Sequence, residues 1–86
     1  MIERAFTIKN ETGLHARPAS QFVQRASKFK STIKVKKDAK EANAKSIISV
    51  LTLGAGIGSQ ITLVVDGIDE AEAADALIEL LDSFEE

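Results

Sequence analysis

The spacing between apolar residues alternates along this 86-residue chain between a period of two and a period of three to four. A period of two is typical of strands with one buried face, whereas the longer period is typical of helices with one apolar stripe. The strand pattern covers residues 2–8, 32–37 and 59–66, and a short partner strand is predicted near 40–43 after a tight turn at 38–40.

The helical pattern appears three times. The predicted helices begin at Ala16, at Ile47 and at about residue 69. Pro18 fits the first turn of the first helix, where its missing N–H needs no partner. Ser46 is a good N-cap for residues 47–53, and Asp69 and Glu70 complement the positive end of the last helix dipole. The apolar stripe of that last helix is predicted to comprise Ala71, Ala74, Leu77, Ile78, Leu81 and Phe84.

The resulting order is β-α-β-β-α-β-α. Helices with one apolar stripe must bury it, and strands with one-sided alternation offer one face to cover. We therefore predict an α+β fold, an open-faced β-sandwich in which three helices cover one face of a four-stranded, mostly antiparallel sheet. The chain is short and has no linker or repeat, so one domain is expected over residues 1–86.

The composition excludes several functional classes. Without Cys there is no disulfide or thiolate chemistry, and one His leaves too few ligands for a zinc site, so no metal and no cofactor are expected. No apolar run approaches the ~20 residues that span a bilayer, and the amino-terminal segment is too charged for a signal peptide. A cytoplasmic protein without membrane insertion is the expectation.

The charges are unevenly distributed along the chain. All 11 Lys and Arg lie in residues 1–46 with four acidic residues, whereas residues 47–86 hold nine acidic residues and no base. Two interpretations stay open: a solvated surface with ordinary ion pairs, or a basic patch that steers an acidic partner.

The segment GLHARPAS, residues 13–20, contains the only His and the only Pro. A helix start offers free N–H groups and partial positive charge that favour phosphate, and Arg17 adds a guanidinium. We expect His15 to accept a phosphoryl group on a ring nitrogen, with Arg17 and the backbone amides of Ala16 and Arg17 holding its oxygens. A plain surface histidine is the alternative. A catalytic triad and a glycine-rich phosphate loop lack their other parts.

GLHARPA at 13–19 and AKSIISVLTLG at 44–54 closely resemble the two signatures of the HPr family of histidine-containing phosphocarriers. The resemblance covers the whole chain. It implies a phosphoryl carrier, not an enzyme, which takes the group from enzyme I onto His15, at Nδ1, and passes it to the IIA domain of a sugar permease. Arg17 would assist both transfers and Pro18 would set the helix start. A shuttle of this kind suits a monomer, and His15 argues against the related Crh proteins.

The resemblance also suggests regulation at Ser46, which matches the position modified by HPr kinase/phosphorylase; a transcriptional regulator of carbon catabolism would be a further partner. The alternative is that Ser46 only caps its helix. The implied partner surface comprises Arg17, Ser20, Gln24, Ser27, Ile47, Ile48 and Leu51. The last three could instead include core residues. Ile48 and Leu51 replace the family's frequent Met, and Ser49 its frequent Gly, which bears on partner choice and kinase recognition.

Two further alternatives stay open. One is a nitrogen-type paralogue with the same chemistry and other partners. The other is a nucleic-acid-binding module built on Lys28, Lys30, Lys34, Lys36 and Lys37. Aromatic residues for base stacking are scarce, with four Phe and no Tyr or Trp, so no nucleic-acid partner is expected.

Overall fold

The computed structural model of the protein describes residues 1–11, 13–14 and 16–84. The predicted order of elements is confirmed. The elements are β1 (Ile2–Thr7), α1 (Ala16–Ala26), β2 (Thr32–Lys37), β3 (Lys40–Asn43), α2 (Ile47–Leu53), β4 (Gln60–Asp66) and α3 (Glu70–Ser83).

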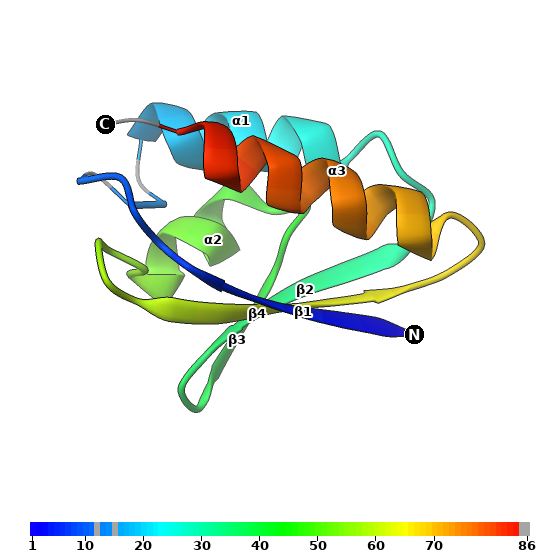
Figure 1. Ribbon diagram of the computed structural model, residues 1–86, viewed down its shortest axis with the longest axis horizontal. Coiled ribbons are helices and arrows are strands. Elements are labelled where there is room, and N and C mark those ends of the chain that lie inside the picture. The colour runs from blue at the N-terminus through cyan, green and yellow to red at the C-terminus, as the bar shows by residue number, and fades with distance from the viewer. Residues whose placement is uncertain (12, 15, 85–86) are drawn as a thin grey trace.

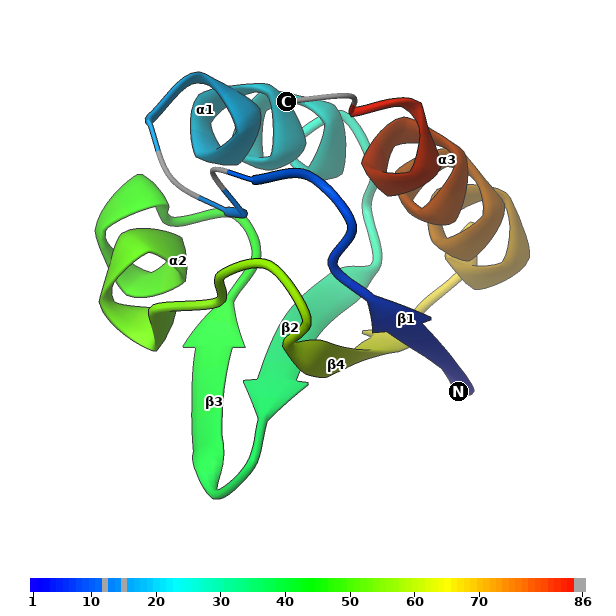
Figure 2. The ribbon, with the colours of Figure 1, turned by 60° about the vertical axis from the view of Figure 1, so that its left-hand side comes forward.

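The four strands form one antiparallel sheet in the order β1-β4-β2-β3. Val35 of β2 lies opposite Leu63 of β4 on one side and Ala42 of β3 on the other, while Phe6 of β1 lies opposite Ile61. All three helices lie over the same face, with α1 and α3 side by side (Figures 1 and 2). The predicted open-faced β-sandwich is therefore confirmed.

The core lies between this face and the helices. Alternate residues of the central strands point into it, as the period of two predicts, and each is essentially inaccessible to solvent. They meet Phe22 of α1, Val50 of α2 and Leu77 of α3. The strand contribution consists of Ile33, Val35, Ile61, Leu63 and Val65.

One charged residue interrupts the apolar pattern of β1. Arg4 has the same parity as Ile2 and Phe6, yet its side chain is exposed. Because β1 is an edge strand, the guanidinium reaches past the sheet, and Nη1 lies 3.0 Å from Oδ1 of Asp75 on α3. Arg4 thus joins the edge of the sheet to a helix without being buried.

The structure corrects the predicted stripe of α3. Ala71 is exposed, and the buried positions are Ala73, Ala74, Leu77 and Leu81. Phe84 packs against the core from beyond the helix end rather than from its stripe. The sequence pattern missed this shift because it could not show the angle at which the helix lies on the sheet. The last strand also begins at Gln60, one residue later than predicted, since Ser59 forms a turn with Gly56.

Asp69 stands at the start of α3, where the sequence predicts that it complements the helix dipole, and it has a second role there. It is the N-cap residue of α3, but its side chain makes no capping hydrogen bond to that helix. Its carboxylate instead accepts from the backbone N–H of Lys30 at 2.8 Å and from the N–H and hydroxyl of Ser31, with the N–H at 2.9 Å. These bonds hold the pKa of Asp69 below its usual value, the Ser31 hydroxyl having the largest effect. Asp69 therefore ties the β4–α3 turn to the segment that enters β2.

Candidate functional site

The predicted phosphoryl acceptor, His15, lies outside the described residues. In the chain it falls between Leu14 and Ala16, and the structure describes what comes before and after it. Ala16 is the first residue of α1. The predicted start of the first helix at Ala16 is therefore confirmed.

The segment before His15 is tightly held. Leu14 is 2% exposed, and its N–H donates to the carbonyl of Ala55 at 2.8 Å. The Asn10 side chain is also buried, and its Nδ2 donates to the carbonyl of Gly13 at 3.0 Å. Buried polar groups of this kind fix a loop because their hydrogen bonds have no water to replace them. The chain therefore approaches residue 15 from a defined position.

Gly13 allows this approach. Its φ of 63° lies in the left-handed region, and a Cβ there would come within 2.3 Å of the Ala55 carbonyl oxygen. Only glycine accommodates both the backbone conformation and the contact. The loop at residues 54–58 that follows α2 therefore supports the segment leading to His15. No local feature of the sequence indicates that the segments at 10–14 and 54–58 touch, because the contact joins residues about 40 positions apart.

The first turn of α1 presents the predicted cation to solvent. Arg17 is exposed and forms no ion pair within the described part of the chain. Pro18 occupies the first turn, as predicted, where it removes no intrahelical hydrogen bond. The first-turn N–H groups together with a free guanidinium form an arrangement that can bind phosphate oxygens.

The predicted partner residues of the α1 region share one face. Arg17, Ser20 and Gln24 belong to α1, and Ser27 directly follows its last residue, with its N–H still donating to the carbonyl of Val23. Arg17, Gln24 and Ser27 are exposed, and Ser20 is half-buried. Their spacing of three or four residues places them in a row along the helix. Figure 2 shows α2 beside α1, on the side where the chain enters that helix. The two groups of predicted partner residues therefore belong to neighbouring helices.

The predicted partner residues of α2 are all on the surface. Ile48 is 74% exposed, Ile47 37% and Leu51 38%. The alternative that at least one of them belongs to the core is wrong, because this short helix buries only Val50 and Leu53. Three branched apolar side chains at the surface of one helix form a contiguous patch of the kind that marks contact sites. We call Ile47, Ile48 and Leu51 the α2 patch.

Ser46 caps α2, as predicted. Its backbone is extended, with φ −118° and ψ 116°, and its Oγ accepts from the N–H of Ser49 at 3.4 Å. The side chain remains partly exposed. The preceding Lys45 is already engaged, since its Nζ donates to the carbonyl of Phe29 at 2.8 Å.

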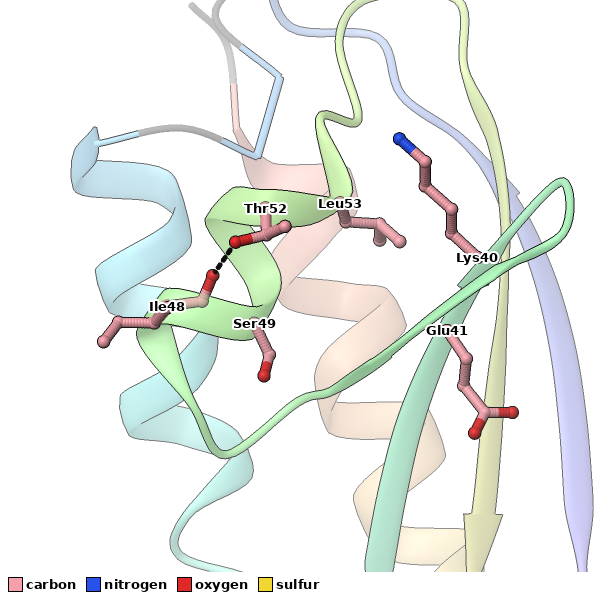
Figure 3. A pocket seen from close by; sticks show the side chains of 6 residues that line it. All are labelled: Lys40, Glu41, Ile48, Ser49, Thr52 and Leu53. Carbon is pink, nitrogen blue, oxygen red and sulfur yellow. Dashed lines mark hydrogen bonds between the residues drawn. The ribbon is translucent and has the colours of Figure 1, made fainter.

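A pocket of about 330 Å³ lies between α2 and β3 (Figure 3). Its charged groups are Lys40 and Glu41, and Glu41 also pairs with Lys34 at 3.4 Å. The Thr52 hydroxyl donates to the carbonyl of Ile48 within α2. The remaining lining residues are Ser49 and Leu53. Opposite charges, hydroxyls and apolar carbons together favour no single class of ligand.

The lysines of the nucleic-acid alternative are dispersed. Lys28 and Lys30 belong to the segment after α1, whereas Lys34 and Lys36 alternate with buried β2 residues on the uncovered face of the sheet. Lys37 is half-buried at the end of β2. These residues do not form one basic stripe of the kind that binds a nucleic-acid backbone.

Within the described ranges, no group of three His, Cys, Asp or Glu side chains could hold a metal ion. Among the helices described, none is long and apolar enough to cross a bilayer.

Comparison with known proteins agrees with this architecture. Residues 2–83 match the family model described as the PTS HPr component phosphorylation site. The chain is 49% identical over 82 residues to the HPr-like protein Crh of Halalkalibacterium halodurans, covering 95% of this chain and 98% of the relative. It is 47% identical over 81 residues to the phosphocarrier protein HPr of Cupriavidus necator, with coverages of 94% and 91%.

Solved structures are equally similar. HPr-C-His from Thermoanaerobacter tengcongensis has a TM-score of 0.94 and 53% identity, covering 96% of this chain and 93% of that one. An HPr dimer from the same organism has a TM-score of 0.78 and 53% identity, with coverages of 96% and 95%.

Proposed function

This chain belongs to the HPr family, and we propose that it carries a phosphoryl group on His15, received from phosphorylated enzyme I and delivered to the IIA domain of a sugar permease. The observation that carries the proposal is the arrangement around residue 15. A locked Gly13–Leu14 segment precedes it, and the first turn of α1 with the exposed Arg17 follows it. In this role the protein is a covalent intermediate in a transfer chain rather than an enzyme.

The chemistry needs only a nucleophile and a site for the phosphoryl oxygens. The Nδ1 lone pair of His15 attacks phosphorus and forms a P–N bond as the bond between phosphorus and enzyme I breaks. In the second step the acceptor attacks phosphorus, the P–N bond to His15 breaks, and its electron pair returns to Nδ1. Arg17 and the amides of the first turn would neutralise the oxygens in both steps. A helix N-terminus stabilises an exposed anion by about 0.3–1 kcal/mol, so the group is held without being trapped.

One face of α1, with Arg17, Ser20 and Gln24, would form the partner surface together with the following Ser27 and the α2 patch. The exposed apolar side chains of the α2 patch would form the centre of the interface, where water is excluded on binding, and the adjacent polar residues would form its solvent-accessible rim. The same arrangement serves successive partners, because donor and acceptor must each reach residue 15 from outside. We place this exchange in the cytoplasm.

We propose that the monomer is the transferring form. The Thermoanaerobacter relative has been solved as an HPr dimer, so the relatives do not support the expectation that such a carrier is always monomeric. Light scattering coupled to gel filtration, with and without phosphorylation, decides the oligomeric state of this chain.

The decisive experiment is a labelling assay. The protein is incubated with enzyme I and phosphoenolpyruvate, and the labelled product is tested for stability in acid and in base. We expect one phosphate that is lost in acid and kept in base, as a P–N bond requires, and no label in His15→Ala. Label that persists in that variant, or no label on the wild type, overturns the proposal.

Regulation is proposed at Ser46. A phosphate there would add about −1.5 to −2 charge at the N-cap of α2, directly beside the α2 patch. The fold tolerates negative charge at this position, while an acidic partner is repelled. HPr kinase/phosphorylase and a transcriptional regulator of carbon catabolism are the partners that this modification would involve.

The relatives include both HPr and Crh by name. The histidine at position 15 of this sequence favours the carrier role over a purely regulatory one, because it supplies the nucleophile that transfer requires. Incubation of the labelled protein with sugar-type and nitrogen-type IIA domains separates the two kinds of acceptor.

A further inference from the structure

The groove between α1 and α3 contains two cations, and no described residue that lines it carries a carboxylate. It is a pocket of about 180 Å³, formed by Arg25, Lys28 and the amide side chains of Gln21 and Gln24, with Leu80 of α3 opposite. None of the lining residues that the structure describes is acidic, and neither cation forms an ion pair with a described residue.

This absence of acid is unexpected, because α3 is the acidic helix of the molecule. Asp75, Glu79 and Asp82 are spaced three and four residues apart and therefore share one face of α3. That face is directed toward the amino-terminal strand region, where Asp75 pairs with Arg4 and Asp82 with Lys9. The face toward α1 is different, and it contributes the apolar Leu80 to the groove. Asp75 and Asp82 thus pair with cations in another part of the protein.

We propose that this groove binds a small dianion of the phosphate class. The Arg25 guanidinium can donate two parallel hydrogen bonds to phosphate oxygens, and the Lys28 ammonium supplies a second charge. The amides of Gln21 and Gln24 add neutral donors that fit a tetrahedral anion. The volume suits a phosphate or a compact phosphate monoester, since typical pockets for larger ligands begin at about 300 Å³.

The site is separate from the predicted phosphoryl site. Arg25 lies two turns beyond Arg17 on α1, about 12 Å along the helix axis. The groove also needs no histidine, enzyme I or transfer step. Its occupancy is therefore independent of the proposed function, although Gln24 is shared with the partner surface.

The test is a titration of the isotope-labelled full chain by nuclear magnetic resonance, at constant ionic strength set with chloride. The probes are inorganic phosphate, methyl phosphate and malonate. Binding by both phosphates assigns the site to monoesters, and binding by inorganic phosphate alone assigns it to the free ion. We expect saturable shifts in the amides of Gln21, Gln24, Arg25, Lys28 and Leu80, with a millimolar dissociation constant because the groove is open to solvent.

Variants give the test its specificity. Arg25→Gln and Lys28→Gln should each weaken binding by about fivefold, and the double variant should abolish saturation. Lys36→Gln removes the same charge from the opposite face of the sheet, so it serves as the matched control and should bind as wild type does. All three substituted positions are exposed, so well-dispersed spectra should verify that every variant is folded.

Three results overturn the proposal. The first is shifts confined to the start of α1, which would place the only anion site there. The second is equal binding by the double variant, and the third is malonate binding as tightly as either phosphate, which would mean general attraction of anions.

Discussion

Gly13 and Ala55 touch across 42 positions of sequence, so closely that a Cβ on residue 13 would lie 2.3 Å from the Ala55 carbonyl oxygen. The next residue, Leu14, donates its N–H to that same oxygen at 2.8 Å. The carbonyl of Ala55 therefore determines where the chain lies immediately before His15. The glycine loop after α2 acts through this contact rather than as a ligand-binding loop.

Gly13→Ala should destabilise the protein by about 2–4 kcal/mol, because it combines left-handed strain with overpacking. Gly54→Ala is the matched control: its φ of 67° nearly equals the 63° of Gly13, but no atom lies within 4 Å of its Cβ position. Strain alone should reduce the stability of that variant by about 1–2 kcal/mol. Urea unfolding measures both, and equal losses would show that the Ala55 contact does not matter.

Asp69→Asn should remove part of the acid sensitivity of the fold. The pKa of Asp69 is lowered from 3.8 by its bonds to Ser31 and Lys30, so its contribution is fully present above about pH 4. That contribution is lost as the pH falls through the lower pKa of the folded state. Urea unfolding at a series of pH values from about 2 to 6 should therefore show that the free energy of unfolding depends less steeply on pH in Asp69→Asn than in wild type. Asp75→Asn, which disrupts only an exposed ion pair, is the control, and an unchanged slope for Asp69→Asn contradicts the assignment.

Ile48→Lys should slow phosphoryl transfer from enzyme I while leaving the melting temperature within about 2 °C of wild type. The reason is that Ile48 is 74% exposed, so its apolar surface is available to a partner rather than to the core. Ile68→Lys makes the same change at a side chain that is 90% exposed. It belongs to the turn between β4 and α3, and that turn lies across the molecule from α2 (Figure 1). Stopped-flow transfer rates compare the two, and equal slowing would remove the α2 patch from the partner surface.

Arg17→Ala should lower the rate of transfer by about tenfold, since hydrogen bonds to charged groups contribute about 1.5–3 kcal/mol. The melting temperature should hardly change, because the exposed side chain forms no ion pair within the described chain. Arg17→Lys keeps the positive charge but loses the bidentate hydrogen-bonding geometry. Its transfer rate should therefore lie between the rates of wild type and Arg17→Ala. Quench-flow measurements with enzyme I determine the rates, and equal rates for Arg17→Ala and wild type would exclude the guanidinium from the mechanism.

Ser46→Asp should weaken binding to enzyme I, and more at low salt than at high salt because the repulsion is screened. Asp is as good an N-cap as Ser, so α2 should persist. Ser46→Asn is a neutral variant of nearly the same shape and should bind as wild type does. Calorimetry at two salt concentrations measures the affinities, and the same affinity for the Asp and Asn variants would argue against electrostatic control.

The candidate site was predictable where its signals are local. The start of α1 at Ala16, Pro18 in its first turn and the capping of α2 by Ser46 all depend on residues within a few positions of one another. The support of Gly13 by Ala55 was not predictable, because nothing local distinguishes one turn glycine from another. The solvent exposure of the α2 patch was likewise not predictable, because an apolar run in a short helix is compatible with burial and with exposure.

The sequence by itself determined the type and order of the seven elements, because the period of apolar residues reports which faces a segment must bury. Only the tertiary structure decided that Asp69 binds Lys30 and Ser31. It also decided that the described residues lining the groove beside Arg25 and Lys28 include no acid. Such contacts depend on how the helices are oriented on the sheet. That orientation comes from packing among residues far apart in the chain, which no local pattern records.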